Sequence, residues 1–144
     1  MASLTLPPAV RLFLERARVG RLATAGAEGA PAVIPICFAV AGETLFTPID
    51  GKPKRARGRD LQRVRNLAAN PKAAVVVDRW DEDWTRLAWV HLRGRATLVT
   101  GGPWQARGAA LLQDKYAQYR EMGLEGRPLI VMTLTAVTCW GDLD

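Results

Sequence analysis

The sequence predicts a mainly β fold, an antiparallel β-barrel with accessory helices in the order α-βββ-α-ββ-α-β. The 144 residues match the usual size of one domain, and 49% hydrophobic with 24% charged residues is ordinary for a globular chain. Many segments alternate apolar and polar residues at a period of two, which is typical of half-buried strands. The strands follow one another without regular βαβ alternation, which disfavours a doubly wound parallel sheet.

The first half of the chain predicts one helix and three strands. These elements are a helix at 8–18 and strands at 19–24, 31–40 and 44–47. Pro7 and Pro8 precede apolar residues at helical spacing, which is typical of a helix start. Pro35 cannot donate to a ladder, so we expect the second strand to be interrupted, bulged or at an edge there. Turns at Gly26 and Gly42 separate the strands, which we expect to form a meander.

The second half predicts two helices and three strands. Asp60 suits an N-cap, and Asn70-Pro71 ends the helix that follows it. The remaining elements are strands at 72–78 and 87–100, a helix at 103–120 and a strand at 128–140. Residues 79–85 form an acidic, tryptophan-bearing turn between the first two of these strands, and we expect its acids to be solvated.

The chain shows no repeat, low-complexity tract or interdomain linker, so we predict a single domain over residues 1–144. No apolar run approaches the 18 residues of a membrane span, and the N-terminus has neither a basic nor a long apolar region. We therefore expect no membrane association and a cytoplasmic location.

The few cysteine and histidine residues limit the chemistry. Cys37 and Cys139 are expected to be buried small side chains in a reducing compartment. Together with the single histidine, His91, they cannot supply the four ligands of a structural zinc site, so no metal is predicted. A structural role is the plainer interpretation of His91, which is only a weak candidate for a general acid.

The net charge of +6 is concentrated in one segment. Residues 52–72 carry eight basic groups against one acid, and the rest of the chain is nearly neutral. Thr47 to Arg55 places a glycine and two lysines directly after a strand, which could fold around a phosphate, although a solvated basic loop is the simpler alternative. The stretch 52–65 contains no aromatic residue, which disfavours nucleic-acid binding.

Five tryptophans are many for this length. They are Trp80, Trp84, Trp89, Trp104 and Trp140. Packing in the core or at a dimer interface is the plain interpretation, and lining the pocket of an aromatic ligand is the alternative.

Four motifs in this order resemble the pyridoxamine-phosphate-oxidase-like flavin and deazaflavin oxidoreductases. They are Gly29-Ala-Pro-Ala-Val-Ile-Pro35, Thr47-Pro-Ile-Asp-Gly-Lys-Pro-Lys54, Val64-Arg-Asn-Leu-Ala-Ala-Asn-Pro71 and Trp89-Val-His-Leu-Arg-Gly-Arg-Ala96. The chain looks most like the small actinobacterial branch that uses the deazaflavin coenzyme F-420. The resemblance covers nearly the whole chain and implies an antiparallel split β-barrel of the FMN-binding type. It also implies a homodimer with its cofactor sites at the interface.

The resemblance also implies which residues bind the cofactor. The ring system would lie against Val33, Ile34, Pro35 and Ile36. The residues implied near the phosphate are Thr47, Pro48, Lys52, Lys54 and Arg65. Trp89 and His91 would face the partner's cofactor from across the interface. No catalytic side chain is implied, because the cofactor carries the chemistry.

These features lead to the hypothesis of an F-420-dependent oxidoreductase that transfers a hydride between the cofactor and a small conjugated organic substrate. An FMN-binding oxidase or reductase of the same fold, or a non-enzymatic flavin or haem carrier, is the alternative. The tail 137–144 lacks the arginine- and histidine-bearing ending of true pyridoxamine-phosphate oxidases, which disfavours vitamin B6 oxidation.

Overall fold

The computed structural model describes residues 4–49 and 61–144. Its helices are α1 (Pro8–Arg16), α2 (Gln62–Ala69), α3 (Gly102–Lys115) and α4 (Ala117–Met122). Its strands are β1 (Gly20–Ala25), β2 (Pro31–Ile36), β3 (Ala39–Ala41), β4 (Thr44–Pro48), β5 (Lys72–Arg79), β6 (Ala88–Val99) and β7 (Leu129–Gly141). The predicted mainly β class is confirmed. No helix in the described ranges has the length and apolarity needed to cross a bilayer.

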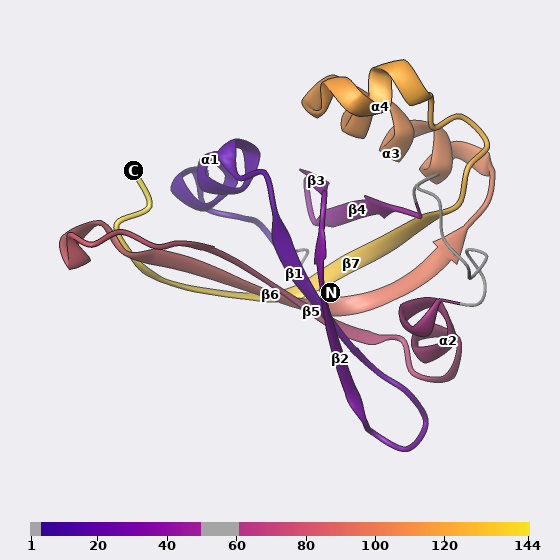
Figure 1. Ribbon diagram of the computed structural model, residues 1–144, viewed down its shortest axis with the longest axis horizontal. Coiled ribbons are helices and arrows are strands. Elements are labelled where there is room, and N and C mark those ends of the chain that lie inside the picture. Colours follow the sequence, from indigo (N-terminus) through magenta and orange to yellow (C-terminus); the bar gives the residue numbers. More distant parts are fainter. Residues whose placement is uncertain (1–3, 50–60) are drawn as a thin grey trace.

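All these strands form one antiparallel sheet in the order β2-β1-β5-β6-β7-β4-β3. The two edge strands, β2 and β3, are consecutive in the chain, and only Cys37 and Phe38 separate them. Such a short connection spans at most about 11 Å, so the two edges of the sheet must lie close together. The sheet therefore curls into a split barrel with the helices around it (Figure 1).

The segment 31–40 does not form one strand, and the predicted three-stranded meander is wrong. β2 continues through Pro35, which lies opposite Arg21 of β1, and the strand ends at Ile36. The expectation of an edge strand at Pro35 is confirmed, because β2 ends the strand order and a missing N–H is tolerated there. β3 then pairs with β4 at the other edge of the sheet.

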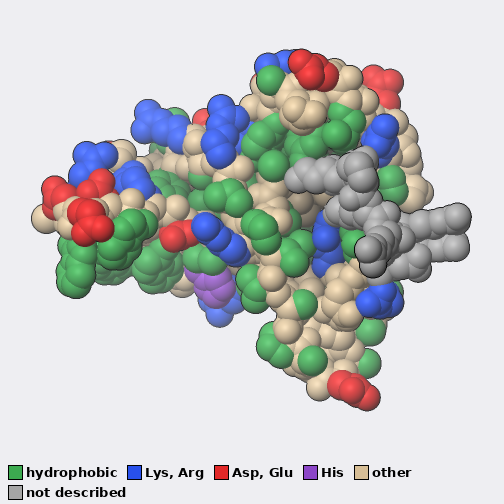
Figure 2. Space-filling model, viewed as in Figure 1, with side chains coloured by type: hydrophobic (Ala, Val, Ile, Leu, Met, Phe, Trp, Pro, Cys, Tyr) green, Lys and Arg blue, Asp and Glu red, His purple; other side chains and the backbone are tan. Residues whose placement is uncertain are grey.

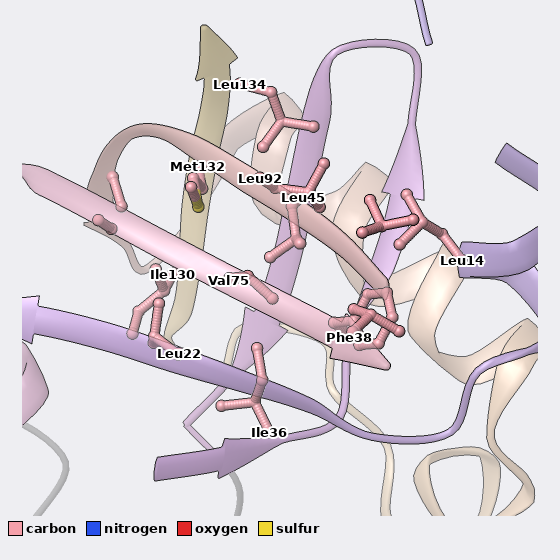
Figure 3. Close-up of a cluster of buried hydrophobic side chains, with 14 of the residues drawn as sticks. Leu14, Leu22, Ile36, Phe38, Leu45, Val75, Leu92, Ile130, Met132 and Leu134 are labelled. Carbon is pink, nitrogen blue, oxygen red and sulfur yellow. The ribbon is translucent and has the colours of Figure 1, made fainter. Parts of the chain in front are cut away.

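Aliphatic side chains from the strands and α1 fill the barrel. Leu14, Leu22, Leu45, Leu92 and Met132 are among the fully buried ones, and Figure 3 shows them converging from different elements. A second cluster, which includes Phe46, Ala109, Leu112 and Leu129, packs α3 against β4 and β7. Each large aliphatic side chain buried in this way stabilises the fold by about 1.5–3 kcal/mol.

The predicted helix 103–120 is two helices. α3 ends at Lys115, and Tyr116 has extended backbone angles (φ −121°, ψ 118°) before α4 begins. The Tyr116 hydroxyl accepts a hydrogen bond from the Phe38 N–H (3.1 Å) and lies 3.1 Å from the carbonyl oxygens of Phe38 and Arg18. These tertiary contacts stabilise the interruption between α3 and α4, and no local sequence pattern predicts them.

The start of α2 also differs from the prediction. Leu61 occupies the N-cap position, without a side-chain hydrogen bond, and Asp60 lies outside the described residues. The end at Asn70 agrees with the prediction, because Asn70 is the C-cap.

Lys115 is half-buried where α3 meets α1. Its Nζ donates to the carbonyl oxygen of Leu14 (3.0 Å) and lies 4.0 Å from the ring centroid of Phe38. Burial removes water from the ammonium group and, with the nearby positive charge of Arg18, lowers the pKa of Lys115 from 10.5 to about 8.

The free energy of unfolding is therefore expected to rise between about pH 8 and 9.5. In this range the unfolded chain binds a proton at Lys115 that the folded chain has already released, and linkage then favours the folded state as pH increases. Urea denaturation across this range measures the slope. Lys115→Met should remove most of it, whereas Lys72→Met, at an exposed lysine, should keep it. An unchanged slope in Lys115→Met would contradict the prediction.

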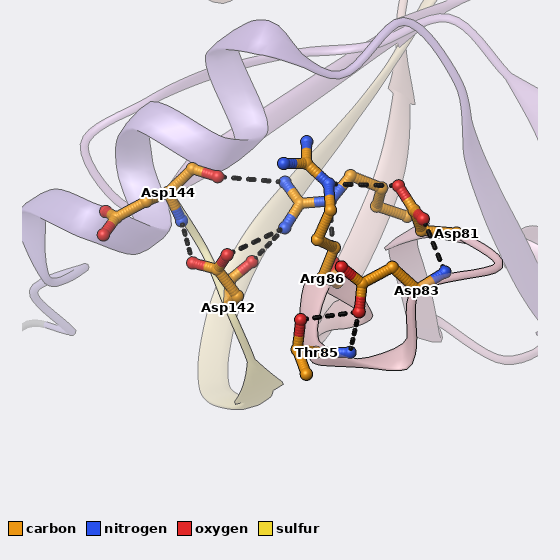
Figure 4. A network of polar contacts seen from close by, with 7 residues as sticks. Asp81, Asp83, Thr85, Arg86, Asp142 and Asp144 are labelled. Atoms are coloured by element: carbon orange, nitrogen blue, oxygen red, sulfur yellow. Dashed lines mark hydrogen bonds and ion pairs between the residues drawn. The ribbon is translucent and has the colours of Figure 1, made fainter.

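A polar network joins the β5–β6 turn to the C-terminus (Figure 4). Arg79 donates to the carbonyl oxygens of Asp142 and Asp144. The Thr85 hydroxyl and N–H both donate to Asp83, at 2.7 and 3.0 Å, and lower the pKa of its carboxyl group. Because exposed ion pairs stabilise a fold little, this network chiefly orients the turn.

Candidate functional site

A cavity of about 340 Å³ lies where the two edges of the sheet approach each other. Its lining includes Ile34, Pro35 and Ile36 from β2, and Thr47 and Pro48 from the end of β4. Arg18, Val19, Cys37, Arg63 and Tyr119 complete the lining. The closure of the barrel thus brings together five of the residues that the resemblance implied for a cofactor.

β2, which contributes apolar side chains to this cavity, is an edge strand of the sheet. Within the described chain β2 pairs with β1 alone, and Ile36 lies opposite Gly20. An antiparallel edge strand leaves alternate N–H and C=O groups without a ladder partner. Such groups can form hydrogen bonds with the edge of a planar ring. Within the described sheet, these groups lack a ladder partner because β2 is an edge strand.

Thr47 and Pro48 lie at the point where β4 leaves the sheet. Thr47 is only 1% exposed and lies opposite Ile130 of β7. The N–H of Ile49 then donates to the carbonyl oxygen of Pro128 (3.0 Å), which anchors the end of the strand. Lys52 and Lys54, the predicted phosphate ligands, lie outside the described residues.

Helix α2 supplies Arg63 to the cavity, whereas Arg65 does not line it. The helix is anchored to β1 by Asn66, whose Nδ2 donates to the Thr24 hydroxyl (3.0 Å) inside the protein. Residues two apart on a helix point in nearly opposite directions, so Arg63 and Arg65 cannot both face the cavity. Arg65 is exposed, and its guanidinium donates to Gln62 Oε1 (2.7 Å). Of the two arginines, Arg63 lines this cavity, whereas the resemblance had implied Arg65 near the phosphate.

Arg18 is a second cation at the cavity, and the sequence analysis missed it. Its guanidinium donates to the carbonyl oxygen of Lys115 (2.6 Å) and lies 5.6 Å from the ring centroid of Tyr116. These contacts orient the side chain without neutralising its charge. The described lining holds two guanidinium groups and no carboxylate, an arrangement that suits an anionic ligand.

The cysteines are less buried than predicted. Cys37 is half-buried in the cavity wall, and Cys139 is exposed on β7, so the expectation of two buried cysteines is wrong. Both are free thiols. Among residues 4–49 and 61–144, no three His, Cys, Asp or Glu side chains gather as a metal site requires.

Val33, Trp89 and His91 lie outside the cavity lining. Val33 is 63% exposed on β2. Trp89 and His91 alternate with buried residues of β6 and thus share its outer face. Trp89 lies directly opposite Trp140 of β7.

All five tryptophans are exposed, so the interpretation that they pack in the core is wrong. Figure 2 shows hydrophobic side chains gathered beside His91, in purple, toward the end of the molecule that carries the β5–β6 turn. Trp80, Trp84, Trp89 and Trp140 belong to this turn or to the strands next to it. We refer to these four residues as the tryptophan patch.

The proteins to which this chain is similar include two reductases and a haem storage protein. Over 93 aligned residues the chain is 37% identical to a 5a,11a-dehydrotetracycline/5a,11a-dehydrooxytetracycline reductase of Streptomyces rimosus, and the match covers 62% of each protein. The chain therefore spans less than two thirds of that relative. An F420 reductase structure is 28% identical, with a TM-score of 0.65 over 92% of this chain and 98% of that chain.

A haem storage protein from Vibrio cholerae has the same fold, with a TM-score of 0.72 and 17% identity over 96% of this chain and 95% of that chain. The family model for pyridoxamine 5′-phosphate oxidase matches residues 6–141, from the segment before α1 to the end of β7. Because this match includes every helix and strand described above, the chain belongs to the pyridoxamine 5′-phosphate oxidase family.

Proposed function

We propose that this protein is an oxidoreductase that uses the deazaflavin coenzyme F-420 to reduce a small conjugated organic substrate. The observation that carries the proposal is the cavity in which the apolar edge of β2 meets the guanidinium groups of Arg18 and Arg63. The similarity to an F420 reductase over nearly the whole chain supports the choice of cofactor. The similarity to a reductase of a dehydrotetracycline supports reduction of a conjugated substrate.

The described residues fit a planar ring joined to a phosphodiester. Ile34 and Ile36 offer apolar contact, and backbone groups on the outer edge of β2 can bind the polar ring edge. The buried Thr47 hydroxyl and the two guanidinium groups can bind phosphate oxygens. When bound, the reduced deazaflavin supplies a hydride to an electron-poor double bond. The protein's own task is to orient the ring, hold the phosphate and keep water from the reacting face.

Charge supports a long anionic cofactor over FMN. Eight basic groups against one acid in residues 52–72 exceed what a single phosphate requires, and F-420 bears a phosphodiester and a glutamate tail. Of these eight basic residues, Arg63, Arg65 and Lys72 belong to the described part of the chain.

Parallel calorimetric titrations with F-420 and FMN test the proposal. Tighter binding of F-420, with an affinity that falls as salt rises, is expected because the tail adds charge that the basic segment can meet. Tighter binding of FMN would move the protein to the flavin-dependent alternative. Binding of haem with neither coenzyme would support the carrier alternative and overturn the proposed reaction.

We further propose that the protein is a homodimer that uses the tryptophan patch. Four large exposed hydrophobic side chains at one end of a sheet are typical of an interaction surface. Within the tryptophan patch, Trp89 and Trp140 lie directly opposite each other in the β6–β7 ladder, so they form a continuous pair on adjacent strands.

The double substitution Trp89→Glu/Trp140→Glu is expected to convert the dimer into a monomer, because it places two carboxylates where apolar area would be buried. Sedimentation equilibrium measures the change, and we expect the dimer dissociation constant to rise at least a hundredfold. Leu12→Glu, at a leucine of α1 that is 42% exposed, is the matched control and should leave the dimer intact. A dimer that survives the double substitution would contradict this interface.

A further inference from the structure

A second cavity, of about 570 Å³, lies on the open face of the sheet where β1, β5 and β6 run side by side. It shares no lining residue with the candidate cofactor cavity. Its lining is rich in small residues, among them Ala23, Ala25, Ala74 and Gly94. Small side chains on a sheet leave a flat apolar surface, and the volume lies within the range of about 300–1,000 Å³ that is usual for small-molecule sites. We call this cavity the sheet groove.

Three cations line the sheet groove. They are Lys72 on β5 and Arg93 and Arg95 on β6. Lys72 lies directly opposite Arg95 in the β5–β6 ladder, and Arg93 lies two residues from Arg95 on the same face. All three residues are exposed. Within the described chain, no hydrogen bond or ion pair joins these three side chains to another residue. The described residues that line the groove include no Asp or Glu.

The positions of these charges are unfavourable without a ligand. Like charges directly opposite each other on neighbouring strands destabilise a sheet. Grouped cations in a concave surface also raise the local concentration of anions. A bound anion would relieve the repulsion between Lys72 and Arg95.

A β-bulge shapes the same part of the groove. The register between β6 and β7 shifts between Arg93 and Gly94, which leaves Thr135 as the extra residue on β7. The Thr135 hydroxyl donates to the carbonyl oxygen of Arg93 (3.3 Å) and lines the groove. Bulges commonly redirect side chains next to binding sites, and this one lies beside both arginines.

We propose that the sheet groove binds an organic anion with a flat apolar body, of the class of aromatic carboxylates and sulfonates. The alanine-rich surface contacts the ring, and Lys72, Arg93 and Arg95 bind the acid group. This site is separate from the cofactor cavity and does not depend on which cofactor the protein uses. Along β6, Arg95 lies six residues from Trp89, about 20 Å, so the groove is also distinct from the tryptophan patch.

Calorimetric titration of the full chain with 2-naphthoate, and with uncharged 2-naphthalenemethanol, tests the proposal. The wild type is expected to bind 2-naphthoate at least tenfold more tightly than the alcohol, with an affinity that falls as salt rises. Arg95→Gln should weaken naphthoate binding about tenfold or more, as expected for loss of a charged hydrogen bond. Arg107→Gln removes the same charge from an exposed position on α3 and should leave the affinity unchanged.

Thermal unfolding gives a second readout, in which the shift caused by naphthoate separates ligand binding from the structural effect of the substitution. Arg95→Gln should raise the melting temperature by about 1–3 °C, because it relieves the repulsion with Lys72. Naphthoate should then raise the melting temperature of the wild type more than that of the variant.

Three results would overturn the proposal: no binding of naphthoate to the wild type, equal loss of affinity in Arg107→Gln, or loss of naphthoate binding in Arg63→Gln instead of Arg95→Gln. The last result would assign the probe to the cofactor cavity. Titration of Arg95→Gln with F-420 separates the two sites, because we expect the affinity for F-420 to be unchanged.

Discussion

Arg63→Gln is expected to weaken F-420 binding by about 2 kcal/mol, roughly thirtyfold in the dissociation constant. Arg63 lines the candidate cofactor cavity from α2, beside Thr47 and Pro48 at the end of β4. Removing its charge leaves the phosphate of the cofactor with one fewer guanidinium partner, while the neutral amide keeps some hydrogen-bonding capacity. Isothermal titration calorimetry at fixed salt measures the difference.

Arg65→Gln is the matched control. It removes the same charge two residues along the same helix, from an exposed side chain that donates to Gln62. We expect its effect to stay within about twofold, and circular dichroism should confirm that both variants keep the fold. A larger loss in Arg65→Gln than in Arg63→Gln would restore the assignment implied by the family resemblance.

Gly94→Ala is expected to lower the free energy of unfolding by about 3 kcal/mol, at the upper end of the usual cost of overpacking. A Cβ atom at Gly94 would lie 2.1 Å from the carbonyl oxygen and 2.9 Å from the carbonyl carbon of Thr133. Both are backbone atoms of β7, so no side chain can rotate away. The two longest strands of the sheet, β6 and β7, would have to separate at their bulge.

Urea denaturation measures this change, and Gly101→Ala provides the control. Gly101 precedes α3, and a Cβ atom there would meet nothing within 4 Å. We expect Gly101→Ala to change the stability by less than about 0.5 kcal/mol. A loss below about 1 kcal/mol in Gly94→Ala would show that β6 and β7 can separate without much cost, against this prediction.

The elements that the sequence predicted well are those whose signals are local. Alternation at a period of two predicted β6 within a residue at each end, and Pro7 with Pro8 predicted where α1 starts. Turn glycines separated the strands of both hairpins. These patterns depend on a few neighbouring residues, so tertiary contacts with the rest of the chain do not change what they predict.

The errors came from contacts between distant residues. Tyr116 ends α3 because its hydroxyl meets Phe38 and Arg18, which are far away in sequence. The segment 31–40 is divided because the sheet closes at Cys37 and Phe38, with β2 and β3 at opposite edges. Hydrophobic periodicity cannot predict the end of α3 or the division of segment 31–40, because both depend on residues far away in the sequence.

The candidate site shows the same division. The resemblance implied Ile34, Pro35, Ile36, Thr47 and Pro48, and the structure places all five around one cavity. It also implied Arg65, although the helical phase of α2 turns Arg63 to that cavity instead. The buried residues Val64 and Leu67 were a signal for this phase, but the sequence alone did not say which side of the helix met the cavity.

By itself, the sequence determined the mainly β class, most element positions, the family resemblance and the concentration of positive charge in residues 52–72. Only the tertiary structure decided that Arg18 reaches the cavity, that the tryptophans are exposed, and that Lys72, Arg93 and Arg95 meet in a groove. The physical reason is that period and composition act through neighbours in the chain. Closure of a sheet instead brings side chains together across long sequence separations, and it decides their burial and electrostatic environment.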